Sequence, residues 1–312
     1  MIAPVTRYSS EGAPSSPSTT RATIHILLAA LGFGAISIFT VVATQRGGAT
    51  LLSVLAWRYL LATLALIVLS RGVAPLRIPP RRALAILLLG GGGQTLIALL
   101  ALSALRFIPA STLGFLFYTF PAWVALFGLV RRTERLDARR AIALLLALAG
   151  IAVMVGVPGG SVGSLTGVLM ALASAVAYAL YIPLLERLQK GITPAAASAY
   201  ICTGASVLLV SIGVTLGAFQ TNMSTKAWGA ILGLALVSTT AAFVLFLKGL
   251  AVLGPLRSAI ISTVEPFFTA ILAAAVLSQP LTASTVAGGA MVATAVVLLA
   301  MARSPAAITI ER

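Results

Sequence analysis

Only one acidic side chain of this sequence falls inside an apolar segment. The six acidic residues are Glu11, Glu134, Asp137, Glu186, Glu265 and Glu311, and all except Glu265 lie in a tail, a loop or a terminus. An enzyme needs a positioned acid, base, nucleophile or metal. The single histidine, His25, and the single cysteine, Cys202, build no such constellation. We therefore predict no catalytic residue, no metal site and no cofactor.

Glu265 points to binding or proton transfer instead. It lies in the middle of an apolar run, and a charged group at the bilayer centre costs about 2.5–3.5 kcal/mol on insertion scales. Pro266 follows directly, which removes one backbone donor and frees a carbonyl in mid-helix. Two interpretations stay open for Glu265. It is either a site for a proton or a substrate amine, or a hydrogen-bonded packing residue.

Four other side chains are predicted at similar depth. Gln94 follows a run of four glycines (90–93), whose favoured role is close helix packing, and its amide needs a partner on another helix or a ligand. Tyr178 and Tyr181 are three residues apart and share a helix face, and Tyr118 lies midway along another span. We predict that some of these residues and Glu265 border one central, water-accessible cavity. Packing in the core is the alternative for the tyrosines.

The elements that must position these residues are transmembrane helices. Apolar residues make up 60% of the 312 residues, charged residues only 9%, and the mean hydropathy is +1.09. A soluble domain carries about 25% charged residues, so the surplus apolar surface must face hydrocarbon. Runs of about 20 apolar residues, each long enough to span a bilayer, alternate with short polar turns. The predicted spans are 22–44, 51–70, 82–105, 108–130, 138–157, 163–186, 195–219, 226–248, 254–277 and 282–302.

The basic residues predict orientation and not nucleic-acid binding. The net charge is +15, but Lys and Arg lie between apolar runs. With the N-terminus in the cytoplasm, the inside set is Arg7, Arg21, Arg71, Arg77, Arg81, Arg82, Arg131, Arg132, Arg135, Arg139, Arg140, Arg187, Lys190, Lys248, Arg257, Arg303 and Arg312. The outside set is Arg46, Arg106 and Lys226, while Arg58 lies within a span from which it can snorkel outward. Both termini are predicted to be cytoplasmic, including a disordered tail at 1–21 and a short tail at 304–312.

The two halves of the chain look like copies of each other. A shift of 145 positions places spans on spans, with Phe33 on Tyr178 and Pro121 on Pro266. Each half, 22–157 and 163–303, holds five spans, so the second enters the membrane from the opposite side. Two equivalent prolines predict kinked or broken helices that face each other at mid-membrane. The predicted fold is therefore an all-α integral membrane protein with ten transmembrane helices in two inverted five-helix repeats.

These patterns resemble the EamA family of the drug/metabolite transporter superfamily. The resemblance covers residues 22 to about 303 and rests on Phe33-Gly34, Arg58-Tyr59-Leu60-Leu61-Ala62, Pro109-Ala110-Ser111, Glu134-Arg135-Leu136 and Glu265-Pro266. Phe33 stands where the family usually has Trp, and Gln279 where the second repeat usually has Glu. Within the family, the chain looks most like exporters of aromatic amino acids.

The resemblance implies export of small metabolites, above all aromatic or other neutral amino acids, by alternating access. It also implies a multi-pass protein of the bacterial inner membrane, whose partners are the bilayer and a small-molecule substrate. Export of cationic drugs or toxic compounds is the alternative, which Glu265 as a buried anion would suit. A passive channel or a lipid scramblase is a second, less favoured alternative function. Composition leaves the exact substrate, the coupling ion and the oligomeric state open.

Overall fold

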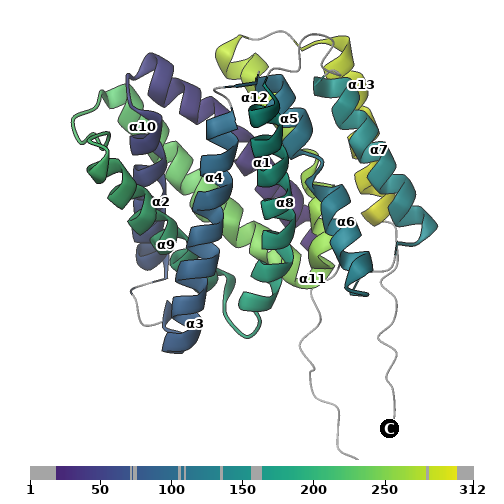
Figure 1. Ribbon diagram of the computed structural model, residues 1–312, viewed down its shortest axis with the longest axis horizontal. Coiled ribbons are helices and arrows are strands. Elements are labelled where there is room, and N and C mark those ends of the chain that lie inside the picture. Colours follow the sequence, from purple (N-terminus) through teal and green to yellow (C-terminus); the bar gives the residue numbers. More distant parts are fainter. Residues whose placement is uncertain are drawn as a thin grey trace, which may run out of the picture.

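The protein is a bundle of long helices that run roughly side by side (Figure 1). The computed structural model describes residues 19–70, 72, 76–104, 107–108, 110–133, 136–155, 164–278 and 281–300, and no strand occurs within them. The predicted tails at 1–18 and 304–312, and Pro109, Glu134, Arg135 and Gln279, lie outside these described residues.

Five helical rods make up the first half. They are α1 (Thr19–Val41) with a π-helical end (Val42–Arg46); α2 (Leu51–Leu69); α3 (Pro80–Ala85), a π-helical turn (Ile86–Gly91) and α4 (Gly92–Ala104); α5 (Ala110–Phe117) with α6 (Phe120–Val130); and α7 (Ala138–Val155). The second half contains α8 (Leu165–Leu188); α9 (Pro194–Thr215); α10 (Thr225–Ala235), a π-helical turn (Leu236–Ala241) and α11 (Ala242–Ser262); α12 (Glu265–Leu277); and α13 (Ala283–Ala300).

Six of the described helices are long and apolar enough to cross a membrane, and shorter apolar helices accompany them. Two helices extend a few residues beyond the predicted spans. The first helix begins at Thr19 and not at Ala22, because no helix-breaking residue separates the two and Ala22 is already buried. The eighth span continues past 248 to Gly254, whose φ of 74° interrupts α11 and lets the chain turn back.

The repeat predicted from the sequence is visible in the helix ends. α7 begins at Ala138 and ends at Val155, and α13 begins at Ala283 and ends at Ala300, which is the same helix moved by 145 positions. Two residues, 118 and 119, separate α5 from α6, and their equivalents 263 and 264 separate α11 from α12. Because Gly254 interrupts α11, the part of α11 after Gly254 forms the ninth rod together with α12. The fourth and ninth rods are therefore broken at matching places.

Hydrogen bonds between connecting loops show that the repeats are inverted. The Arg82 guanidinium, just after the loop between the second and third rods, donates to the Lys190 carbonyl between the sixth and seventh. At the other end, the Thr50 backbone N–H donates to Gln220 and the Ser224 hydroxyl donates to the Gly47 carbonyl. The first loop of one repeat and the first loop of its copy thus lie at opposite ends of the bundle.

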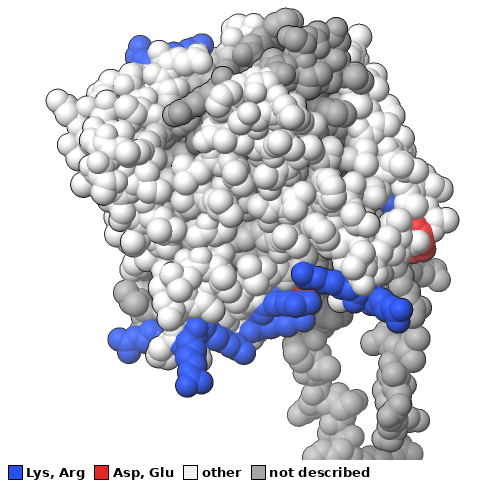
Figure 2. Space-filling model, viewed as in Figure 1, with Lys and Arg blue, Asp and Glu red and all other residues white. Residues whose placement is uncertain are grey.

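Charge is distributed unequally between the two ends. Lys and Arg side chains gather at one end of the molecule, with a smaller group at the opposite end (Figure 2). The richer end is the one where the Arg82 guanidinium of α3 donates to the Lys190 carbonyl after α8, and we call it the basic end. The body between the two ends presents mostly uncharged side chains in this view, as lipid contact requires.

The four-glycine run serves helix packing, as its favoured interpretation predicted. A Cβ at Gly91 would lie 2.5 Å from the Gly204 Cα, so the third rod and α9 meet backbone to backbone. Gly93 leaves room for the Tyr181 ring, which would lie 2.8 Å from a Cβ there. These glycines therefore let helices of the two repeats approach each other beside the centre of the bundle.

This close approach predicts that Gly204→Ala destabilises the protein. Alanine normally favours a helix interior by about 1 kcal/mol over glycine, but a Cβ at Gly204 would overlap the Leu87 carbonyl oxygen. We expect a lower melting temperature for the purified protein in detergent. Gly229→Ala is the matched control, because no atom lies within 4 Å of a Cβ at that helical glycine. Equal melting temperatures for the two variants would contradict the packing argument.

Candidate functional site

A cavity of about 130 Å³ lies in the middle of the bundle, between the two repeats. For comparison, an apolar cavity of about 150 Å³ can hold a benzene molecule. Its walls come from both halves and combine aromatic rings with three polar side chains. The lining residues are Phe33, Ile36, Arg58, Gln94, Ile97, Phe117, Tyr178, Tyr181, Leu185, Phe243, Phe246 and Glu265.

Arg58 does not snorkel outward as the sequence allowed. Its side chain is 4% exposed, and its Nε donates to the Thr239 hydroxyl over 2.6 Å. Nη2 also lies 3.5 Å from the Ser238 carbonyl oxygen. Both partners belong to the π-helical turn before α11, and Thr239 in turn donates to the Leu234 carbonyl. The turn thus supplies oxygen acceptors that hold the guanidinium at the cavity wall.

Gln94 forms a hydrogen bond with Tyr59, the residue of α2 that follows Arg58. Its Nε2 donates to the Tyr59 hydroxyl over 3.0 Å, so the amide finds the partner that its depth requires. Gln94 and Thr239 are equivalent under the 145-residue shift. Matching positions of the two repeats therefore fix two adjacent side chains of α2, Tyr59 and Arg58.

Glu265 is the first residue of α12, directly after the break in the ninth rod. Pro266 therefore lies in the first turn of α12 and not in mid-helix. A backbone N–H at the start of a helix has no acceptor within that helix, so the N–H that proline lacks costs no hydrogen bond here. Pro121 has the same place at the start of α6. The side chain of Tyr118, which lies in the break of the fourth rod, is close to that of Glu265. The two broken helices therefore meet through these side chains.

Aromatic rings form most of the remaining wall. Phe117 stacks on Tyr178 with ring centroids 5.4 Å apart, and Tyr178 is 6.4 Å from Tyr181. On the opposite side, Phe33 meets Phe243 edge to face at 5.5 Å. Phe33 and Tyr178 are repeat equivalents that face one cavity from α1 and α8. Such a wall suits flat apolar groups and, through the ring faces, cations.

The structure brings four of the five predicted cavity residues to this cavity: Gln94, Tyr178, Tyr181 and Glu265. Tyr118 stands behind Glu265 and does not line it. The residue that the site prediction missed is Arg58. The sequence did contain a clue. Arg58 lies within an apolar run, as Glu265 does, and a charged residue at that depth needs a partner inside the protein.

Two segments of the chain, residues 20–156 and 165–301, match the EamA-like transporter family. The chain belongs to this family. The matched segments begin 145 positions apart, as 165 − 20 = 145, which agrees with the shift seen in the helices. The family is one of small-molecule transporters built from two repeats, and the cavity lies between those repeats in this EamA-like protein.

A solved crystal structure of a protein also shares the fold. It superposes with a TM-score of 0.76 over 90% of this chain and 96% of that chain, at 20% sequence identity. No curated protein matches the sequence significantly.

The contact between Arg58 and Thr239 yields a stability prediction. Thr239→Val keeps the shape of the side chain and removes the acceptor of the buried guanidinium, which should lower the free energy of unfolding by about 1–3 kcal/mol. Denaturant unfolding in detergent micelles measures the change. Thr294→Val is the matched control, because Thr294 is exposed and bonds only to a carbonyl of its own helix. An unchanged free energy of unfolding in Thr239→Val would show that the buried guanidinium does not depend on this acceptor.

Proposed function

We propose that this EamA-like protein is a secondary transporter that exports small metabolites, above all aromatic or other neutral amino acids, by alternating access. One observation carries the proposal. Arg58 and Glu265 line the same aromatic-walled cavity between two inverted repeats. Substrate sites of secondary transporters occur at such a place, near the midplane and beside broken helices.

The pair of opposite charges fits a zwitterion. A guanidinium binds a carboxylate through directed hydrogen bonds, and a carboxylate binds an ammonium group. An α-amino acid offers both groups, and its side chain would lie against the rings of Phe33, Phe117 and Tyr178. The overall resemblance of the sequence to exporters of aromatic amino acids favours the same substrate class.

Export of cationic compounds is the second candidate. Glu265 and the surrounding rings favour it, because ring faces and a carboxylate both attract a cation. Arg58 opposes it, since a cation without a carboxylate leaves the guanidinium without a counter-charge. The role of Arg58 therefore separates the two candidates.

Three related probes test this function in liposomes that contain the full-length protein. L-phenylalanine carries both charges, phenethylamine only the ammonium, and 3-phenylpropionate only the carboxylate. We expect saturable uptake of L-phenylalanine and stimulation by the same compound trapped inside, which a carrier shows and a channel does not. Preference for phenethylamine would favour the cationic candidate. Wild-type protein that moves none of a panel of neutral amino acids would contradict the proposal.

Charge-removing variants should shift the preference among the probes. In Glu265→Gln, transport of L-phenylalanine should lose its pH dependence or fall sharply, because the ammonium group loses its charged partner. The rate for 3-phenylpropionate relative to L-phenylalanine should rise. Arg58→Gln should shift preference toward phenethylamine. Arg77→Gln, which removes an exposed charge far from the cavity lining, is the control. Unchanged rates and pH profile for Glu265→Gln would leave Glu265 a structural residue.

We further propose that the protein resides in the bacterial inner membrane with the basic end and both termini in the cytoplasm, as positively charged loops favour the cytoplasmic side. Cysteine labelling tests this orientation. Cys202 is buried and can be replaced to leave a background without thiols. In intact cells, a membrane-impermeant maleimide should label Lys226→Cys but not Arg77→Cys or Lys190→Cys. The reverse pattern would contradict the orientation.

A further inference from the structure

A second and larger cavity lies at the basic end of the bundle. Its volume is about 360 Å³, and it is walled by α6, α8 and the chain around Gly254. We call it the basic pocket. The residues that line it are Val124, Phe127, Gly128, Arg131, Thr133, Leu180, Pro183, Glu186, Arg187, Lys190, Gly254 and Pro255.

The pocket combines an apolar floor with a cationic rim. Among the described lining residues, three are cations, Arg131, Arg187 and Lys190, and one carries a carboxylate, Glu186. Lys190 is paired with this carboxylate at 3.7 Å. Among the described salt bridges none involves Arg131 or Arg187, so two exposed guanidinium groups face the pocket without a counter-charge.

This charge is not a general consequence of the fold. Under the 145-residue shift, Arg131 corresponds to Val276, Arg187 to Val42, Lys190 to Gln45 and Glu186 to Val41. The equivalent place at the other end of the bundle therefore carries no charge. The cationic rim belongs to one end only, which gives the molecule a direction.

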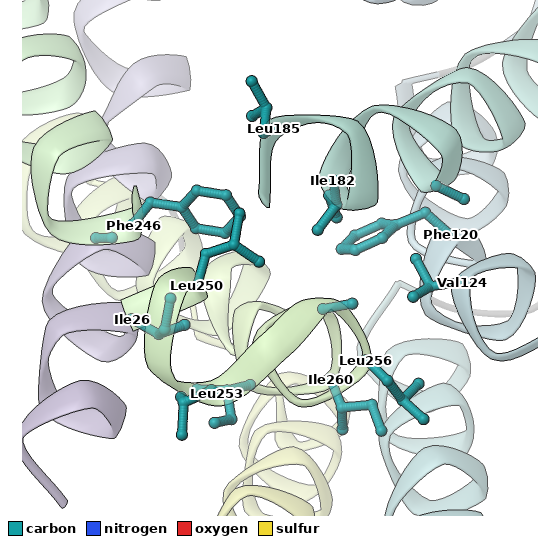
Figure 3. Packing of buried hydrophobic residues seen from close by; sticks show 14 of the residues in the cluster. Ile26, Phe120, Val124, Ile182, Leu185, Phe246, Leu250, Leu253, Leu256 and Ile260 are labelled. Carbon is teal, nitrogen blue, oxygen red and sulfur yellow. The ribbon is translucent and has the colours of Figure 1, made fainter. Parts of the chain in front are cut away.

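The pocket lies close to the central cavity. Phe120 contacts Tyr178 of the central cavity, with ring centroids 4.8 Å apart, and Val124, one helical turn further along α6, lines the basic pocket. On α8, Tyr181 and Leu185 line the central cavity, whereas Pro183 and Glu186 line the basic pocket. The fully buried side chains of Phe120, Ile182 and Leu250, which we call the apolar layer, pack in one core cluster (Figure 3). The same cluster contains Val124 of the basic pocket and Leu185 of the central cavity.

From these observations we propose that the basic pocket is a docking site where the carboxylate of a substrate binds at the basic end before it passes the apolar layer to the central cavity. Arg131 and Arg187 bind the carboxylate, and Val124, Phe127 and Leu180 receive the apolar part. A cation would be repelled at this rim, so the pocket selects against the cationic substrates that Glu265 alone would accept. This inference rests on the proposed function and names the group by which its substrate is first recognised.

Transport kinetics measured separately from each side test the docking site. The double variant Arg131→Gln/Arg187→Gln is reconstituted in liposomes, and the orientation is sorted by labelling of Arg77→Cys. For L-phenylalanine offered at the basic end, KM should rise roughly tenfold at an unchanged maximal rate. From the opposite end KM should stay unchanged and the maximal rate should fall by the same factor, because Vmax/KM must be equal in the two directions when no gradient drives transport. The wild-type KM at the basic end should also increase with salt, and that of the variant much less. The KM for phenethylamine, which lacks the carboxylate, should be the same in the double variant and in the wild type.

Arg81→Gln is the matched control, because it removes an exposed guanidinium that does not line the pocket. An equal change in KM from both sides, or the same change in Arg81→Gln, would overturn the docking site. So would an effect seen only in vesicles that contain anionic phospholipid, since the pocket would then bind a lipid headgroup.

A binding measurement remains decisive even if L-phenylalanine is not transported. Thr133→Cys, in a background with Cys202→Ala, places a thiol in the pocket. In neutral-lipid vesicles 3-phenylpropionate should slow its reaction with a neutral maleimide, and phenethylamine should not. Adding Arg131→Gln/Arg187→Gln should abolish this protection. Absence of protection in the parent protein would refute the docking site whatever the outcome of the transport screen, whereas protection without amino acid transport would refute only the proposed substrate.

Discussion

Two side chains of opposite charge, Arg58 and Glu265, border one small cavity in the middle of an apolar bundle, and much of the surrounding structure compensates for their burial. Each would cost a few kcal/mol at the centre of a bilayer if it were left alone. Thr239 and the Ser238 carbonyl accept from Arg58, and the side chain of Tyr118 lies close to Glu265. The helices are irregular at the segments that supply these partners. A π-helical turn that holds Ser238 and Thr239 precedes α11, and the two-residue break that holds Tyr118 precedes α6.

This irregular backbone is placed where a membrane protein can tolerate it. Non-helical backbone at membrane depth is stable only when protein or a polar cavity surrounds it. The breaks at 118–119 and 263–264 lie in the interior, where Phe120 is fully buried and Glu265 lines the cavity. The broken rods and the glycine-mediated contacts, such as that between Gly91 and Gly204, together bring the two repeats close to each other around a cavity with polar groups.

The inverted repeat also explains why the cavity and the basic pocket differ in character. Equivalent residues face each other across the centre, as Phe33 and Tyr178 do, so the cavity receives similar walls from both halves. Away from the centre the copies diverge, and charge is found at the basic pocket but not at its equivalent. A centre with similar walls from both halves is typical of inverted-repeat transporters, whereas the charged rim distinguishes one end of this bundle from the other.

Much of this architecture was determined by the sequence alone. Apolar runs of bilayer length fix where helices lie, because unpaired backbone groups are too costly in lipid. The 145-residue shift followed from spacing, and the match of α7 with α13 confirms it. Gln94, Tyr178, Tyr181 and Glu265 could be selected because polar and aromatic groups at mid-depth need a protein or cavity environment. Their helical phase within a short apolar run is weakly encoded, so the sequence predicted that only some of them, and not which ones, border the cavity; Tyr118 does not line it.

Only the tertiary structure decided which side chains meet. Nothing along the chain pairs Arg58 with Thr239, 181 residues away, or turns the guanidinium inward when outward snorkelling is equally compatible with its depth. The same holds for the basic pocket, whose cations come from the end of α6 and from α8 and lie far apart in the sequence. Hydropathy specifies how deep a residue lies in the membrane. The direction in which its side chain points depends on how ten helices pack, which is a property of the whole bundle.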